Sequence, residues 1–170
     1  MPSGKTHDAI TILLAAPVAA AAHLVFGEVA VTLVVTAAFL FGGLMFGPDL
    51  DTTSRPYARW SVARIIWFPY RKAFPHRSRW SHGLVFGTLF RVIYFFGIIT
   101  LVSTAVYFAA AGSIGDVAKT WSQVGQLSGE YLGLTLLVAA FAGTWLGAAS
   151  HTITDVTITY IKTGRTGKLF

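Results

Sequence analysis

The sequence predicts an all-α membrane protein, a single domain in which four transmembrane helices form a bundle. Hydrophobic residues make up 54% of its 170 residues and charged residues only 12%, whereas soluble domains carry about 25% charged residues. Four apolar stretches each approach the roughly 20 residues that a helix needs to cross ~30 Å of hydrocarbon. These stretches are residues 9–26, 29–48, 83–112 and 131–149.

The first two spans are expected to form a tight hairpin. Residues 9–26 contain Pro17, which is expected to kink the helix and which neighbouring helices make tolerable in a membrane. Only Gly27 and Glu28 separate this span from the second, which ends at Pro48.

The segment 49–82 between the second and third spans is both basic and aromatic. Its basic residues are Arg55, Arg59, Arg64, Arg71, Lys72, Arg77 and Arg79, and its aromatic residues include Tyr57, Trp60, Trp67, Phe68, Tyr70, Phe74 and Trp80. Both kinds of side chain favour the lipid headgroup layer. We therefore expect a short interfacial helix, broken at Pro69. The net charge of +6 could also suggest nucleic acid, but spans anchor this segment at both ends, so no nucleic-acid partner is expected.

The third span, residues 83–112, is too long to cross the bilayer without tilt, because its 30 residues reach about 45 Å at 1.5 Å per residue. Arg91 lies within it and either reaches the headgroups or points inward and pairs with an acid. Residues 113–130 are expected to form a polar external loop. The helix of the fourth span is expected to continue through Asp155.

The distribution of basic residues predicts the orientation. Lys5 precedes the first span, the segment 49–82 carries seven bases, and Lys162, Arg165 and Lys168 follow the last span. Positively charged loops stay in the cytoplasm, so both termini and the segment 49–82 are predicted to be cytoplasmic.

Small residues predict close packing at the same ends of the spans. Gly43 and Gly47, Gly83 and Gly87, and Gly143 and Gly147 are each four residues apart, a spacing that lets helix backbones approach closely.

Acids and histidines also gather at these cytoplasmic ends. They are His7, Asp8, Asp49, Asp51, His76, His82, His151 and Asp155. His151 and Asp155 share one helix face, while Asp49 and Asp51 point the same way in an extended stretch. Close carboxylates repel each other unless they share a cation or a proton. His23 lies at the opposite membrane end and is interpreted as an interfacial or packing histidine.

This convergence predicts a metal site. The preferred ligands are His7, Asp49, Asp51, His82, His151 and Asp155. Asp8 is a further ligand or a general base, His76 is a ligand or a proton donor, and Arg77, with Arg79, is a candidate phosphate ligand. Helix capping by Asp8, loop solvation of the Asp49–Asp51 pair and simple topology for the arginines remain open alternatives.

The charge of the acids suggests the number of ions. Four ionised acids are balanced by two divalent cations, with zinc favoured and manganese, iron or magnesium as alternatives. Two metals about 3.5–4 Å apart suit hydrolysis of phosphoesters.

Three motifs, in this order, resemble a known family. They are Pro48-Asp49-Leu50-Asp51, then His76-Arg77 with Ser81-His82, then His151 with Asp155, and they are similar to motifs of the YdjM-like family of membrane-bound proteins classed as metal-dependent hydrolases. The chain departs from that family at Ser81, where Thr is common, and at Gly83, where Ser is common. The opening residues 2–8 and the stretch 42–48 are similar to a subgroup of bacterial, notably cyanobacterial, metal-binding membrane proteins. The resemblance implies a bacterial inner or thylakoid membrane.

These observations favour a metal-dependent hydrolase that works at the cytoplasmic headgroup level. A substrate at that depth is most naturally a phospholipid or another phosphorylated amphiphile. The alternative is a metal-binding protein without turnover, either a structural clamp or an accessory subunit of a membrane complex. A metal transporter is ranked last, because the outer halves of the spans offer almost no polar residues.

Overall fold

Every element that the structure shows is a helix. The structure, a computed structural model, describes residues 2–74, 79–111 and 113–164. Within these ranges the chain forms α-helices and 3₁₀ helices but no strand, which confirms the predicted all-α class. In chain order the elements are α1 (Gly4–Phe26), α2 (Val29–Leu44), the 3₁₀ helix η1 (Pro48–Asp51), α3 (Arg55–Arg59), the 3₁₀ helix η2 (Ser61–Trp67), α4 (Phe68–Ala73), α5 (Arg79–His82), α6 (Phe86–Ala111), α7 (Ile114–Tyr131) and α8 (Gly133–Thr163).

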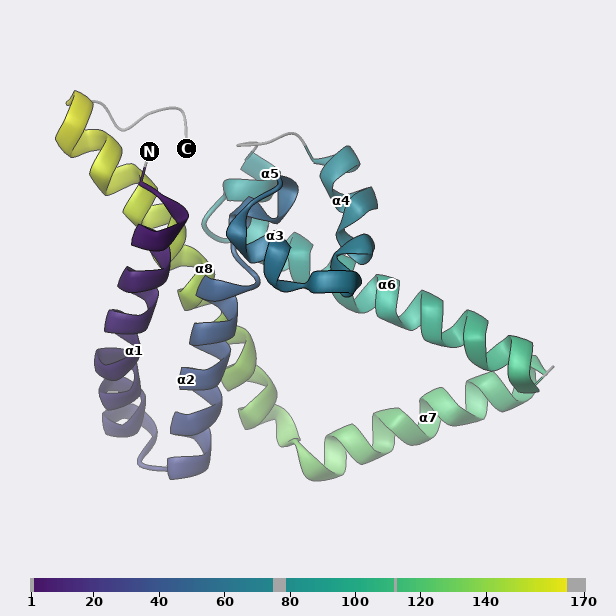
Figure 1. Ribbon diagram of the computed structural model, residues 1–170. Helices are drawn as coiled ribbons and strands as arrows, with labels where there is room; N and C mark the ends of the chain where they lie inside the picture. The colour runs from purple at the N-terminus through teal and green to yellow at the C-terminus, as the bar shows by residue number, and fades with distance from the viewer. Residues whose placement is uncertain (1, 75–78, 112, 165–170) are drawn as a thin grey trace.

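Helices α1, α2 and α8 form a bundle, with α2 packed against both of the others (Figure 1). The contact between α2 and α8 brings backbone against backbone. A Cβ atom on Gly147 would collide with the carbonyl of Phe39, and one on Gly143 would collide with the carbonyl of Val35. The predicted role of the Gly143 and Gly147 pair is therefore confirmed, because only residues without a side chain allow this approach.

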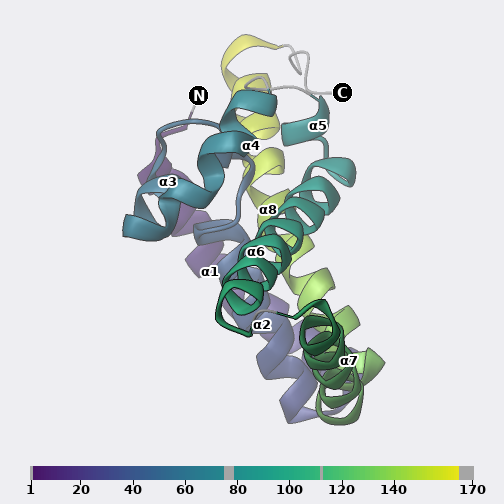
Figure 2. The same cartoon turned by 90° about the vertical axis from the view of Figure 1, so that its right-hand side faces the viewer.

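Helices α6 and α7 leave the bundle and return to it (Figures 1 and 2). The polar loop predicted for residues 113–130 is wrong, because this stretch forms α7. Its apolar residues Val117, Trp121 and Val124 recur at the spacing of one helix face. The Trp121 indole nitrogen donates a hydrogen bond of 2.8 Å to the Thr104 hydroxyl of α6, so this face is turned towards α6.

Three helices are long and apolar enough to cross a membrane, namely α1, α6 and α8. Helix α2 is apolar but has only 16 residues, fewer than the roughly 20 that a span usually needs. Large apolar side chains such as Leu13, Leu24 and Leu134 are exposed on these helices. Apolar surface of this kind marks contact with a membrane or a partner, and the three helices are consistent with a membrane protein.

The segment between α2 and α6 folds into short helices around an aromatic core. Trp67 and Tyr70 are 0% exposed and pack with Phe46 and Leu50. These two rings therefore serve as core residues, whereas the sequence analysis placed them in the headgroup layer. Since Leu50 belongs to η1, the aromatic core fixes the backbone that carries Asp49 and Asp51.

Arg91 points inward. Its side chain is 2% exposed, and its guanidinium donates to the Ser81 carbonyl at 2.6 Å and to the Thr88 hydroxyl at 3.1 Å. Of the two alternatives for this residue, reaching out to the headgroups is therefore wrong. Its positive charge interacts electrostatically with Asp49 and Asp51, so Arg91 contributes to the charge of the candidate site.

Candidate metal centre

Four segments that are distant in sequence meet at one end of the bundle (Figure 1). His7 lies in the first turns of α1, where the Ser3 hydroxyl caps the helix by accepting a hydrogen bond of 3.2 Å from the Thr6 amide. Asp49 and Asp51 lie on η1, which starts at Pro48. His82 ends α5, and His151 and Asp155 lie on α8.

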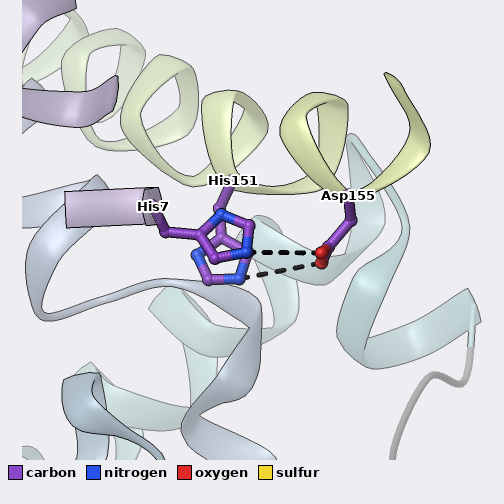
Figure 3. A group of neighbouring side chains, drawn as sticks. All are labelled: His7, His151 and Asp155. Atoms are coloured by element: carbon purple, nitrogen blue, oxygen red, sulfur yellow. Dashed lines mark ion pairs between the residues drawn. The ribbon is translucent and has the colours of Figure 1, made fainter. Parts of the chain in front are cut away.

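His7, His151 and Asp155 form the tightest part of this site (Figure 3). The two imidazole rings stack with their centroids 3.7 Å apart and their planes 1° from parallel. His7 Nε2 lies 3.3 Å from Asp155 Oδ1, and His151 Nε2 lies 3.8 Å from Asp155 Oδ2. Across residues 2–74, 79–111 and 113–164, these three are the one group whose candidate ligand atoms all lie within 4.8 Å of one another, and all three are buried.

Asp49 links this group to His82. Its Oδ2 lies 3.3 Å from His151 Nε2, and its Oδ1 lies 3.4 Å from His82 Nε2. On the other side of the His82 ring, Nδ1 lies 3.5 Å from Asp51 Oδ2 and 3.0 Å from the Ser81 hydroxyl. The six residues preferred as ligands thus form one continuous chain of contacts, although their role as ligands stays a prediction.

The pKa of Asp49 is well below its usual range. Partial burial alone would raise this pKa, but the imidazoles of His151 and His82, whose nitrogens lie 3.3 and 3.4 Å from its oxygens, outweigh burial. The Asp49 carboxylate is therefore held ionised, which is the form that binds a cation.

The spacing of these atoms suits a metal ion better than direct hydrogen bonds. Hydrogen bonds between charged nitrogen and oxygen are about 2.7–2.9 Å long, whereas the contacts of Asp49 with His151 and His82 are 3.3 and 3.4 Å. Ligand atoms about 2.1 Å from a tetrahedral ion are about 3.4 Å from each other. Moreover, both ring nitrogens of His151 and the Nδ1 of His7 are buried without a hydrogen-bond partner among the described residues.

Asp8 has different partners from those expected of a ligand or a base. The Arg59 guanidinium donates to both of its oxygens, at 2.9 and 2.7 Å, and Arg55 Nη1 lies 2.7 Å from its Oδ2. Arg59 also donates to the Leu44 carbonyl at 2.6 Å. Asp8 therefore ties α1 to α3 and to the end of α2, and the structure does not bring it into the His–Asp cluster.

Arg55 and Arg59, which contact Asp8 beside the cluster, were not among the site residues predicted from the sequence. The sequence analysis favoured Arg77, which like His76 lies outside the described residues, as does the side chain of Arg79. The available signal was the spacing of Arg55 and Arg59, four residues apart on one face of a short helix. For Arg91, the sequence signal for an inward-pointing side chain was its position as the one basic residue in a long apolar span.

A cavity of about 280 Å³ reaches the cluster. His7, Asp49 and His151 line it, together with Asp8, Arg55 and backbone from Gly4 and Gly43. A larger cavity of about 590 Å³ lies between α1 and α8 near the opposite end of the bundle, but its lining is almost wholly apolar. The smaller cavity is therefore the one that offers polar chemistry to a ligand.

His23 lies away from this site. Its Nδ1 is 3.4 Å from the Thr32 hydroxyl of α2, near the turn between α1 and α2. Its side chain is exposed, and its role as an interfacial or packing histidine stays a prediction.

Comparison with known proteins supports the metal-binding part of the prediction. A family model described as "Uncharacterized metal-binding protein (DUF2227)" matches residues 2–165. Searches among curated proteins and among solved structures found no match. The hydrolase activity and the likeness to the YdjM-like family stay predictions.

Proposed function

This chain belongs to that family of metal-binding proteins, and from this premise we propose that His7, His151 and Asp155 hold a divalent metal ion beside Asp49 for a hydrolytic reaction at the membrane surface. Two histidines and one carboxylate make a nitrogen and oxygen ligand set that suits zinc and leaves one of its four positions open, with manganese or iron as alternatives.

The charges of the described side chains favour one tightly held ion. Asp8 is neutralised by its arginines, so it no longer counts among the acids that require a cation. Asp49, Asp51 and Asp155 carry three negative charges, and the buried Arg91 carries one positive charge. The two negative charges that remain are balanced by one divalent ion.

A second ion, which four free acids would require, has one further candidate set of ligands among the described residues. Asp49, Asp51 and His82, which contact one another, would hold it. The alternative role for Asp51 is to orient His82, since it faces Nδ1 while Nε2 faces Asp49. A carboxylate behind a metal-binding histidine fixes its ring in this way.

The single observation that supports hydrolysis is the cavity against His7, Asp49 and His151. A structural metal site is closed by four protein ligands, whereas a catalytic site keeps a position open. A bound divalent ion supplies Lewis acidity and lowers the pKa of water to about 7. The chain's own residues hold the ion, orient the histidines and leave room for a substrate beside them.

The surface near the site supports a substrate that resides in the membrane. Val62, Ile65 and Phe68 are 89%, 74% and 53% exposed. Val62 and Ile65 are three residues apart on one side of the 3₁₀ helix η2, and Phe68 follows at the start of α4. The ammonium group of Lys72 lies 5.1 Å from the centre of the Phe68 ring. We propose that this ridge enters the headgroup layer, in agreement with the interfacial role expected of the segment.

The proposed orientation in the membrane follows from the basic residues at the site end of the molecule. The site end, with its arginines, faces the cytoplasm, and α2 crosses the bilayer as a fourth, short span enclosed by α1 and α8. The substrate is then a phosphoester at headgroup depth in a bacterial inner or thylakoid membrane.

The alternative function is a metal clamp in an accessory subunit of a membrane complex, and the burial of His7, His151 and Asp155 favours it.

Turnover separates the two functions. The protein, purified in detergent and loaded with zinc or manganese, is expected to hydrolyse phosphomonoesters, and His151→Ala is expected to abolish this activity. His23→Ala is the matched control and should keep it. Full metal content without turnover on either soluble or lipid phosphoesters would reject hydrolysis and leave the clamp.

A further inference from the structure

The cavity beside the cluster has a second set of polar residues that metal binding does not use. They come from residues 53–55, where the chain enters α3, and include the guanidinium of Arg55. Ser54 is committed to local structure, because its hydroxyl donates to the Asp49 carbonyl at 2.7 Å and accepts from the Tyr57 amide at 3.3 Å. Arg55 is therefore the side chain in this set that has charge to offer a ligand.

Arg55 is held in place at two points along its side chain. Its stem packs on the start of α1, where a Cβ on Gly4 would lie only 2.8 Å from Arg55 Cδ. Its Nη1 lies 2.7 Å from Asp8 Oδ2, and Arg59 holds the same carboxylate from its own side. A guanidinium has five N–H donors, so this one ion pair orients the group and leaves donors for a ligand. The Arg55 side chain is 48% exposed, which makes those donors accessible.

We propose that Arg55 binds the phosphoryl group of a phosphomonoester in the cavity, next to the metal ion. This inference rests on the proposed function for the metal centre and adds to it the group that recognises the substrate. A guanidinium fork matches two phosphate oxygens at once. Arg55 thereby takes the phosphate-binding role that was predicted for Arg77 from the sequence.

The local charges favour an anion over a cation. Two guanidinium groups, Arg55 and Arg59, face the single carboxylate of Asp8, which leaves one positive charge at this end of the cavity. At the other end, the bound ion offsets the charge of Asp49. Without the ion, Asp49 would repel a phosphate, so binding of the anion should require the metal.

The size of the cavity limits what can enter. Pockets for drug-sized ligands are about 300–1,000 Å³, and this cavity is about 280 Å³. A phosphoryl group with a small alcohol fits within it, but acyl chains do not. A lipid substrate would therefore place its headgroup in the cavity and leave its chains among the apolar helices.

The test measures binding of inorganic phosphate to metal-loaded protein in detergent by isothermal titration calorimetry. The variants are Arg55→Gln, Arg55→Lys and, as a matched control, Arg64→Gln, an exposed arginine of η2 outside the cavity. Metal content is measured for each. Arg55→Gln is expected to weaken phosphate binding by about 10- to 100-fold, because charge-assisted hydrogen bonds are lost. Arg55→Lys should bind with intermediate affinity, and Arg64→Gln should match the wild type.

Separate outcomes overturn this inference and the proposed function. Equal phosphate affinity in the wild type and Arg55→Gln, with metal content unchanged, overturns the role of Arg55. Absence of phosphate binding to the metal-loaded wild type overturns it too. Arg55-dependent phosphate binding without any turnover supports the anion site and rejects hydrolysis. Glycerol 3-phosphate and phosphatidic acid, compared in the same way, show whether the phosphomonoester comes from solution or from a lipid.

Discussion

At the scale of single residues, partners decide which of the predicted groups can act as ligands. His7 and Asp8 are neighbours in sequence, yet His7 faces Asp155 and Asp8 faces Arg55 and Arg59. The sequence alone predicts that both lie at the metal end of the bundle, because both open the same span. It cannot separate them, since the partners of Asp8 come from α3, whose position depends on tertiary packing.

Asp8→Asn is expected to keep the metal and to lose stability. The substitution removes the carboxylate that joins α1 to α3, and hydrogen bonds to charged groups contribute about 1.5–3 kcal/mol. Because both arginines are partly exposed, we expect a loss of only about 1 kcal/mol. Thermal unfolding in detergent and elemental analysis measure the two effects, with Asp116→Asn on the exposed face of α7 as the control. Loss of the metal in Asp8→Asn would show that Asp8 is a ligand.

Arg91→Gln is expected to destabilise the protein much more. It removes a buried charge that offsets Asp49 and Asp51, together with bonds to the Ser81 carbonyl and the Thr88 hydroxyl. Each hydrogen bond to a charged group contributes about 1.5–3 kcal/mol. The thermal midpoint should fall well below that of Lys119→Gln, an exposed control. Equal midpoints would show that the charge of Arg91 is not needed.

At the scale of elements, contact between helix backbones sets the position of the ligands. Helix α2 leads through residues 45–47 into η1, which carries Asp49, while α8 carries His151 and Asp155. The glycine spacing predicts that such helices meet closely, and the structure bears this out for α8. The sequence analysis did not predict α7, because its mixture of polar and apolar residues reads as a loop until its face is matched to α6.

Gly147→Ala is expected to disturb the metal centre from a distance. The new Cβ would meet the Phe39 carbonyl, which is backbone and cannot rotate away, so α8 must move relative to α2. We expect metal affinity to fall about 10-fold or more, as it does when contacts that support ligands are lost.

The matched control for this change is Gly125→Ala on α7, where an added Cβ meets nothing within 4 Å. It should keep the metal, with stability unchanged or slightly raised, because alanine favours a helix over glycine by about 1 kcal/mol. If both variants bind metal as the wild type does, close contact of α2 and α8 does not position the site.

At the scale of the whole molecule, the chemistry is concentrated at one end. The cluster and its cavity include His7 near the start of α1. The short helices lie at this same end of the molecule, whereas α7 lies towards the other end (Figure 1). The sequence predicts this asymmetry well, because spans of alternating direction bring alternate ends to the same side. It does not predict the aromatic core around Trp67, since long-range packing is needed to distinguish buried rings from interfacial ones.

The orientation can be tested with single cysteines, because the chain contains none of its own. Lys119→Cys on α7 should react with a membrane-impermeant maleimide in intact cells. Lys5→Cys at the start of α1 should react only after the cells are opened, since the basic end is expected to face the cytoplasm. The reverse pattern would place the metal centre on the outer face.

The central claim is that the buried cluster binds metal, and metal content per chain tests it most directly. Wild type, His151→Ala, Asp155→Ala and the control His23→Ala would be purified alike and measured by elemental mass spectrometry. We predict about one equivalent of a divalent transition metal in the wild type and in His23→Ala, since three carboxylates and Arg91 require two positive charges. We predict its loss from the other two variants. Two equivalents would show that the chain holds a second ion, for which Asp49, Asp51 and His82 are the candidate ligands, whereas wild-type metal content in both His151→Ala and Asp155→Ala would contradict the account.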